Sequence, residues 1–153
     1  MSELAYQLER KQKIAAWSDR WQAEAVRFAD SYRYLFPKQI TDAELYGLGN
    51  VVRSARRYAD IERFFRHQAE KAEHAGRLDV QSYWNDLKDA LGKLRSEAQA
   101  LLKTLPFPAG MDSREELDVL HRELAGLYVQ HLIAHSLYQT PSFVQDEFSA
   151  RRW

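Results

Sequence analysis

The chain has 153 residues, of which 45% are hydrophobic and 29% are charged, so it suits one folded domain and not a disordered chain. Its 22 basic and 22 acidic residues give no net charge, so binding to a polyanion has to come from a local patch. The absence of cysteine excludes disulfides and thiolate metal sites, and we expect a cytoplasmic protein without a membrane-spanning segment.

The first predicted helix runs from about Glu3 to Tyr34, and Pro37 follows its end. Apolar residues recur along it at spacings of three and four. They are Leu4, Leu8, Ala15, Trp21, Ala25, Phe28 and Tyr32. We expect these side chains to face the core.

The second predicted helix begins at Thr41, which has the spacing of a capping box with Glu44. The apolar side chains before and after Asp60 lie on different sides of this helix. A straight helix cannot direct both groups into one core. The sequence therefore predicts a break near residues 58–60, with Asp60 as a candidate N-cap of a new helix. Gly76 is expected to end that helix.

The third main helix is expected from about Asp79 to Leu105, with leucines at heptad spacing. A fourth begins at Asp112 or Ser113, and Ser113 forms a second candidate capping box with Glu116. A short last helix is predicted within the tail 140–153. The chain is thus predicted to be all-α, a single-domain antiparallel bundle of five or six helices.

The segment 51–71, VVRSARRYADIERFFRHQAEK, places arginines among aromatic residues. Spaced guanidinium groups can engage successive phosphates, and exposed rings such as Tyr58, Phe64 and Phe65 can stack on bases. The predicted contacts to RNA or DNA backbone are Arg53, Arg56, Arg57, Arg63, Arg66 and Lys71. The alternative is a solvated helix face whose arginines pair with Glu62 and Glu70 while the two phenylalanines lie in the core.

Two histidine patterns could indicate chemistry. His131 and His135 lie four residues apart on a helix, as two ligands of one metal would, but a third ligand is not evident. We interpret them as core or interface histidines and predict no metal and no cofactor. Arg114 and His121 resemble, at its loosest spacing, the arginine–histidine motif of the helical HEPN ribonucleases. That resemblance implies phosphodiester cleavage, whereas the alternative is a surface arginine near a helix N-terminus.

Aromatic residues offer a candidate protein interface. Trp17 and Trp21 lie one turn apart on the first helix, and Trp153 ends the chain. Tryptophan, tyrosine and arginine dominate protein interfaces, so these rings could contact neighbouring subunits. The alternative is that they cover the ends of the bundle core.

The segment from Ile40 to Ala72 is apolar on its inward positions and carries arginines at its outward ones. In this layout the chain resembles the small helical subunits of type III CRISPR effector complexes. Those subunits stack along a guide–target duplex and have no active site. The resemblance implies a non-catalytic subunit in antiviral defence that packs on other subunits or on copies of itself. A helical ribonuclease and a plain adaptor that binds no nucleic acid are the alternatives.

Overall fold

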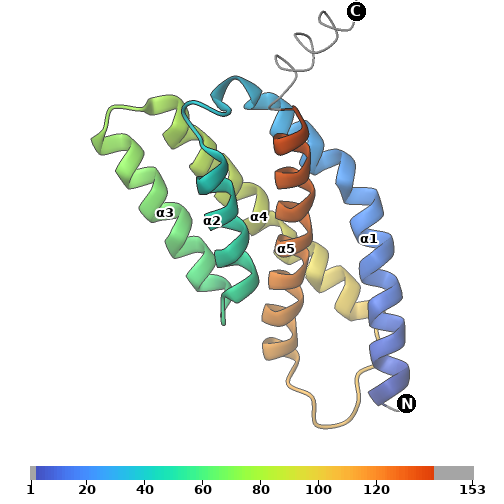
Figure 1. Ribbon diagram of the computed structural model, residues 1–153. Helices are drawn as coiled ribbons and strands as arrows, with labels where there is room; N and C mark the ends of the chain where they lie inside the picture. The colour runs from blue at the N-terminus through green and yellow to red at the C-terminus, as the bar shows by residue number, and fades with distance from the viewer. Residues whose placement is uncertain (1–2, 140–153) are drawn as a thin grey trace, which may run out of the picture.

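The computed structural model describes residues 3–139, and no strand occurs among them (Figure 1). It contains five α-helices and one 3-10 helix, η1. They are α1 (Glu3–Ser31), η1 (Arg33–Leu35), α2 (Asp42–Ser54), α3 (Tyr58–His74), α4 (Leu78–Thr104) and α5 (Ser113–Gln139). Each α-helix runs antiparallel to the next (Figure 1). The all-α bundle is confirmed, while the short helix predicted after residue 139 lies outside the described residues.

Helix α5 lies at the centre of the bundle, where it packs against α1, α2 and α4, and α3 packs on the outer side of α4 (Figure 1). The heptad leucines predicted for α4 are confirmed as core residues, and Leu87, Leu91 and Leu94 have no exposed surface. Among the described residues, no helix is both long and apolar enough to cross a membrane.

Helix α1 buries the predicted face only in its second half, where Ala25 is buried and Trp21 and Phe28 pack against the core, whereas Ala15 is exposed. Leu4 and Leu8 are 70% and 56% exposed, whereas Tyr6, Arg10 and Trp17 are buried. The prediction that Leu4 and Leu8 face the core is therefore wrong. The physical reason is that carboxylates of α5 make the burial of Arg10 favourable, and this sets the rotation of α1.

An ion-pair network around Arg10 joins α1 to α5. The Nη1 and Nη2 atoms of Arg10 each donate to a carboxylate oxygen of Glu123 at 2.9 Å. Its Nε donates to Glu116 at 2.7 Å, and the Tyr6 hydroxyl donates to the same Glu116 oxygen at 3.0 Å. Because all three donor nitrogens of the guanidinium group are paired, Arg10 can be 9% exposed without leaving an unpaired charge in the interior.

Trp17 belongs to the core and not to an open interface. It is 1% exposed, stacks on Trp21 with ring centroids 5.3 Å apart, and donates from Nε1 to Glu97 of α4 at 3.2 Å. This is the arrangement expected of a ring that covers the bundle core and keeps its N–H paired. Trp153 lies outside the described residues.

At the ends of α2 and α3, one predicted cap is confirmed and another is wrong. The Thr41–Glu44 box is confirmed, with the Glu44 N–H donating to the Thr41 hydroxyl at 3.2 Å. The predicted break exists but spans residues 55–57, earlier than expected. Asp60 accepts from the N–H of Arg57 at 3.3 Å, so it supports the first turn of α3 from inside the helix and is not its N-cap.

The predicted capping box between Ser113 and Glu116 is wrong. Asp112 caps α5 instead, because its Oδ1 accepts from the N–H of Arg114 at 2.9 Å. The Glu116 carboxylate points to Tyr6 and Arg10 on α1. A tertiary ion pair has therefore replaced the local hydrogen bond that the spacing predicted.

Candidate functional site

The six basic side chains predicted to contact nucleic acid are all exposed. They follow one another along the α2–α3 hairpin. Arg53 lies in the last turn of α2, Arg56 and Arg57 lie in the linker, and Arg63, Arg66 and Lys71 lie on α3. We call this set the hairpin cations.

Little of this positive charge is neutralised within the fold. Arg63 pairs with Asp60 at 3.3 Å, and Arg53 donates to the neutral amide of Asn50 at 2.7 Å. In the described part of the chain, the other four hairpin cations form no ion pair, and neither Glu62 nor Glu70 pairs with an arginine. An exposed pair such as Arg63–Asp60 contributes less than about 1 kcal/mol, so a phosphate can replace the carboxylate.

The rings between these cations face inward. Tyr58 and Phe65 are buried, and Phe64 packs partly buried against the core. The Phe64 and Phe65 rings lie 5.9 and 6.1 Å from that of Trp84, measured between centroids. Phe64 and Phe65 thus build the α3–α4 contact, and Tyr58 stacks on His121 of α5, so these rings are not open to nucleic-acid bases.

Helix α5 holds the linker that carries Arg56 and Arg57. Asp118 accepts from the N–H of Tyr58 at 3.2 Å and from Nε of Arg122 at 2.9 Å. Arg122 in turn donates from Nη1 to the Ala55 carbonyl at 2.8 Å. Both ends of the linker are thus hydrogen-bonded to α5, which fixes the backbone from which the two exposed arginines project.

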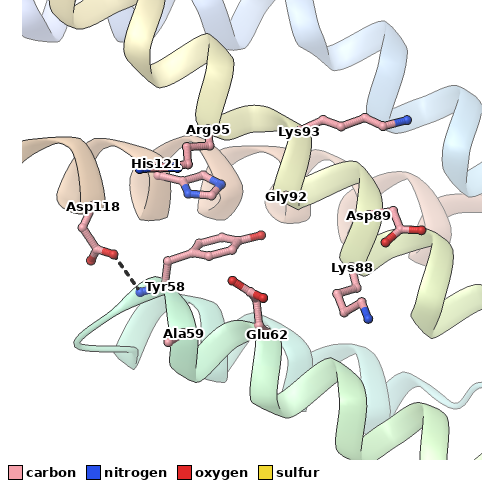
Figure 2. Close-up of a pocket in the computed structure, with 10 residues that line it drawn as sticks. All are labelled: Tyr58, Ala59, Glu62, Lys88, Asp89, Gly92, Lys93, Arg95, Asp118 and His121. Carbon is pink, nitrogen blue, oxygen red and sulfur yellow. Dashed lines mark hydrogen bonds between the residues drawn. The ribbon is translucent and has the colours of Figure 1, made fainter. Parts of the chain in front are cut away.

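A pocket of about 710 Å³ lies beside this linker, between α3, α4 and α5 (Figure 2). We call it the Tyr58 pocket. Its lining includes three cations and three carboxylates. It consists of Tyr58, Ala59, Glu62, Lys88, Asp89, Gly92, Lys93, Arg95, Asp118 and His121.

His121 and Tyr58 form a stacked pair in this pocket, with ring centroids 3.6 Å apart and planes at 18°. The His121 Nε2 lies 2.9 Å from the Leu91 carbonyl oxygen. Because a carbonyl only accepts, Nε2 carries the proton and Nδ1 is left as an acceptor. Burial lowers the pKa of His121, which keeps the imidazole neutral.

Arg114 and His121 do not share a site. Arg114 is exposed and lines a different, smaller pocket with Gln99 and Lys103. His121 lies two helical turns further along α5, a rise of about 10 Å, and contacts Tyr58. The guanidinium and imidazole groups therefore face different pockets, and the geometry gives no support to the ribonuclease alternative.

His131 and His135 each contact α1. The His131 Nε2 lies 2.8 Å from the Ser18 hydroxyl, and the His135 Nε2 lies 2.8 Å from the Asp30 carboxylate. Within residues 3–139, no group of three or more potential ligands could hold a metal ion. The two histidines thus join α5 to α1, as interface histidines do.

The Tyr58 pocket cannot be recognised from the sequence, because its residues come from three helices and follow no local spacing. Only Gly92, a glycine in the middle of a long helix, could have indicated it. No family model, curated protein or solved structure matches the chain. Function therefore has to be inferred from these side chains and their geometry.

Proposed function

We propose that the protein is a non-catalytic helical subunit of a cytoplasmic nucleoprotein assembly and that the hairpin cations bind RNA or DNA backbone. The observation that carries this proposal is the exposure of all six cations, of which only Arg63 pairs with a carboxylate in the described residues. Exposed guanidinium groups form bidentate hydrogen bonds with phosphate oxygens. The resemblance to small subunits of type III CRISPR complexes favours the same role.

The buried rings determine the kind of recognition. Because Tyr58, Phe64 and Phe65 pack inward, the rings that lie among the hairpin cations are not open to bases, and the cations themselves offer charge to phosphates. Phosphate contacts position a protein on nucleic acid without reading its sequence. We therefore expect binding that is independent of sequence and strongly dependent on salt.

The exposed apolar residues suit contacts with neighbouring subunits. Leu4 and Leu8 lie one turn apart on the outer side of α1, and Tyr46 is 57% exposed on α2. Exposed leucine and tyrosine side chains of this size gain free energy when a partner covers them. The partner can be another subunit of the assembly or a second copy of the chain.

Fluorescence anisotropy with a labelled single-stranded RNA, repeated with DNA, tests the proposal. Wild-type protein should bind, and the logarithm of its affinity should fall with the logarithm of salt concentration by about 0.7 per phosphate contact. Replacing Arg53 and Arg57 with glutamate should abolish binding.

The matched control replaces Arg20 and Arg33, which are exposed on α1 and η1, with glutamate. This variant has the same net charge as the hairpin variant and should bind like wild type. Equal loss in both variants would show that net charge alone governs binding. No binding at low salt, together with a stable oligomer in light scattering, would favour the plain adaptor.

A further inference from the structure

In the Tyr58 pocket, the Tyr58 hydroxyl has no hydrogen-bond partner among residues 3–139. Tyr58 is 6% exposed, and its phenolic oxygen is buried and makes no hydrogen bond with any described residue. Figure 2 shows the ring extending from α3 towards α4, with the hydroxyl on the side of Gly92 and Glu62. Burial raises the pKa of Tyr58 far above its usual range, so the group stays protonated and can donate. An unpaired buried donor destabilises a fold, and an acceptor from a ligand would remove that cost.

Gly92 is a second feature of the same pocket that lowers the stability of the fold. It lies within α4, where glycine is a poorer helix former than alanine. A Cβ atom added at Gly92 would meet no atom within 4 Å, and its φ angle is not positive. Neither packing nor backbone conformation therefore requires glycine here. The missing side chain leaves the α4 backbone open to close approach from the pocket.

The three cations and three carboxylates of the pocket offer partners to a ligand that carries both a negative charge and hydroxyl groups. Lys88, Lys93 and Arg95 bring three positive charges from α4 and form no ion pair with a described residue. Glu62 and Asp89 supply carboxylate acceptors, and His121 supplies a neutral acceptor at Nδ1. A volume of about 710 Å³ lies in the range of small-molecule sites.

We propose that the Tyr58 pocket binds a ribose-phosphate unit. The phosphate accepts hydrogen bonds from the Tyr58 hydroxyl and the α4 cations. The sugar lies against Gly92 and donates its hydroxyls to Glu62 and Asp89. The choice of ribose rests on the proposed function, because the pocket adjoins the linker whose Arg56 and Arg57 are proposed to bind nucleic acid. The unit belongs either to a free nucleotide or to the phosphorylated end of a bound strand.

The test is a titration of the full chain with ribose 5-phosphate, in which nuclear magnetic resonance records the chemical shifts of the backbone amides. We expect saturable shifts around the pocket. Tyr58→Phe and Gly92→Ala should each weaken binding roughly tenfold, although both should raise the melting temperature of the free protein. Unshifted pocket amides at millimolar ligand, or wild-type affinity in both variants, would overturn the proposal.

The chain supplies a matched control for each variant. The Tyr83 hydroxyl is also buried without a partner among the described residues, but Tyr83 does not line the pocket. Gly47 lies within α2, where an added Cβ would also meet nothing within 4 Å. Tyr83→Phe and Gly47→Ala should therefore stabilise the fold and leave the affinity for ribose 5-phosphate unchanged. Equal weakening in the controls would overturn the assignment to this pocket.

Competition experiments separate the two sources of the ligand and isolate this site from the hairpin cations. If RNA with a 5′-phosphate displaces ribose 5-phosphate and RNA with a 5′-hydroxyl does not, the ligand is the end of a strand. If only adenosine monophosphate displaces it, the ligand is a free nucleotide. Equal affinity for inorganic phosphate would overturn the ribose part of the proposal. Replacement of Arg53 and Arg57 with glutamate should abolish binding of strand backbone and leave ribose 5-phosphate binding intact, so the two proposals can fail separately.

Discussion

Asp118 of α5 accepts a hydrogen bond at 3.2 Å from the backbone N–H of Tyr58, which lies 60 positions earlier in the chain. The contact supplies, from another helix, an acceptor for one of the free N–H groups at the start of α3. The same carboxylate orients Arg122, which holds the Ala55 carbonyl at the end of α2. One side chain of α5 thus links the hairpin that carries the candidate interface to the centre of the bundle.

We expect Asp118→Ala to lower the free energy of unfolding by about 1–3 kcal/mol, since it leaves the Tyr58 N–H without its acceptor. Urea denaturation followed by circular dichroism measures the change. Glu115→Ala is the control, because Glu115 is an exposed carboxylate in the same first turns of α5. A loss no larger than that of the control would show that water replaces the carboxylate at no cost.

Arg10→Met should destabilise the protein by about 3 kcal/mol, because it leaves Glu116 without its cation in a largely buried position. Arg10→Lys should recover only part of this loss, since an ammonium group cannot reproduce the paired contacts to Glu123. Thermal and urea unfolding would measure both variants. Arg27→Met, which breaks the exposed pair with Glu24, should change stability by less than about 1 kcal/mol.

Stability should fall as the pH drops through 6.5, the ordinary pKa of histidine, because burial lowers the pKa of His121 in the folded state. Between the lowered pKa and 6.5 the unfolded chain binds more protons than the folded chain, so protonation favours unfolding. His121 contributes at most about 1.4 kcal/mol per pH unit to the slope of the free energy of unfolding against pH.

His121→Gln keeps a donor for the Leu91 carbonyl and cannot be protonated, so the difference between its stability curve and that of wild type isolates this contribution. His67→Gln is the control, because His67 is exposed on α3. Parallel curves for wild type and His121→Gln would contradict the prediction.

Two glycines should respond oppositely to alanine. Gly76 follows α3 with a φ of 70°, a conformation that disfavours a side chain, so Gly76→Ala should destabilise by about 1 kcal/mol. Gly47 lies within α2 with open space where a Cβ would be, so Gly47→Ala should stabilise by up to about 1 kcal/mol. Melting temperatures of the two variants provide the measurement. A shift in the same direction for both would contradict this reading of the backbone.

The features predicted correctly depend on neighbours in the chain. The capping hydrogen bond of Thr41 joins it to Glu44, one turn away, and can be read from their spacing. The break after α2 follows from the rotation of the apolar face along the chain. It lies earlier than predicted, because Asp118 accepts from the Tyr58 N–H and α3 begins at Tyr58. Exposure of the hairpin cations follows likewise from their place opposite the apolar residues.

The predictions that were wrong concern residues with distant partners. On α1, Arg10 is buried and Leu8 is exposed, because Glu116 and Glu123 offer three carboxylate oxygens to Arg10. These two partners lie 106 and 113 positions away in the chain. The same contact removes Glu116 from the capping box predicted with Ser113. No local pattern contains such information, because a charged residue is buried only when its counter-charges are already in place.

The sequence by itself determined that the chain is helical, where most helices begin and end, and that an arginine-rich hairpin faces outward. These properties arise from periodicity and from hydrogen bonds within one or two turns. The tertiary structure decided which face of α1 is buried, turned the aromatic residues of the hairpin inward, and assembled the Tyr58 pocket from three helices. These outcomes depend on charges and rings that meet only after α1, α3, α4 and α5 have packed.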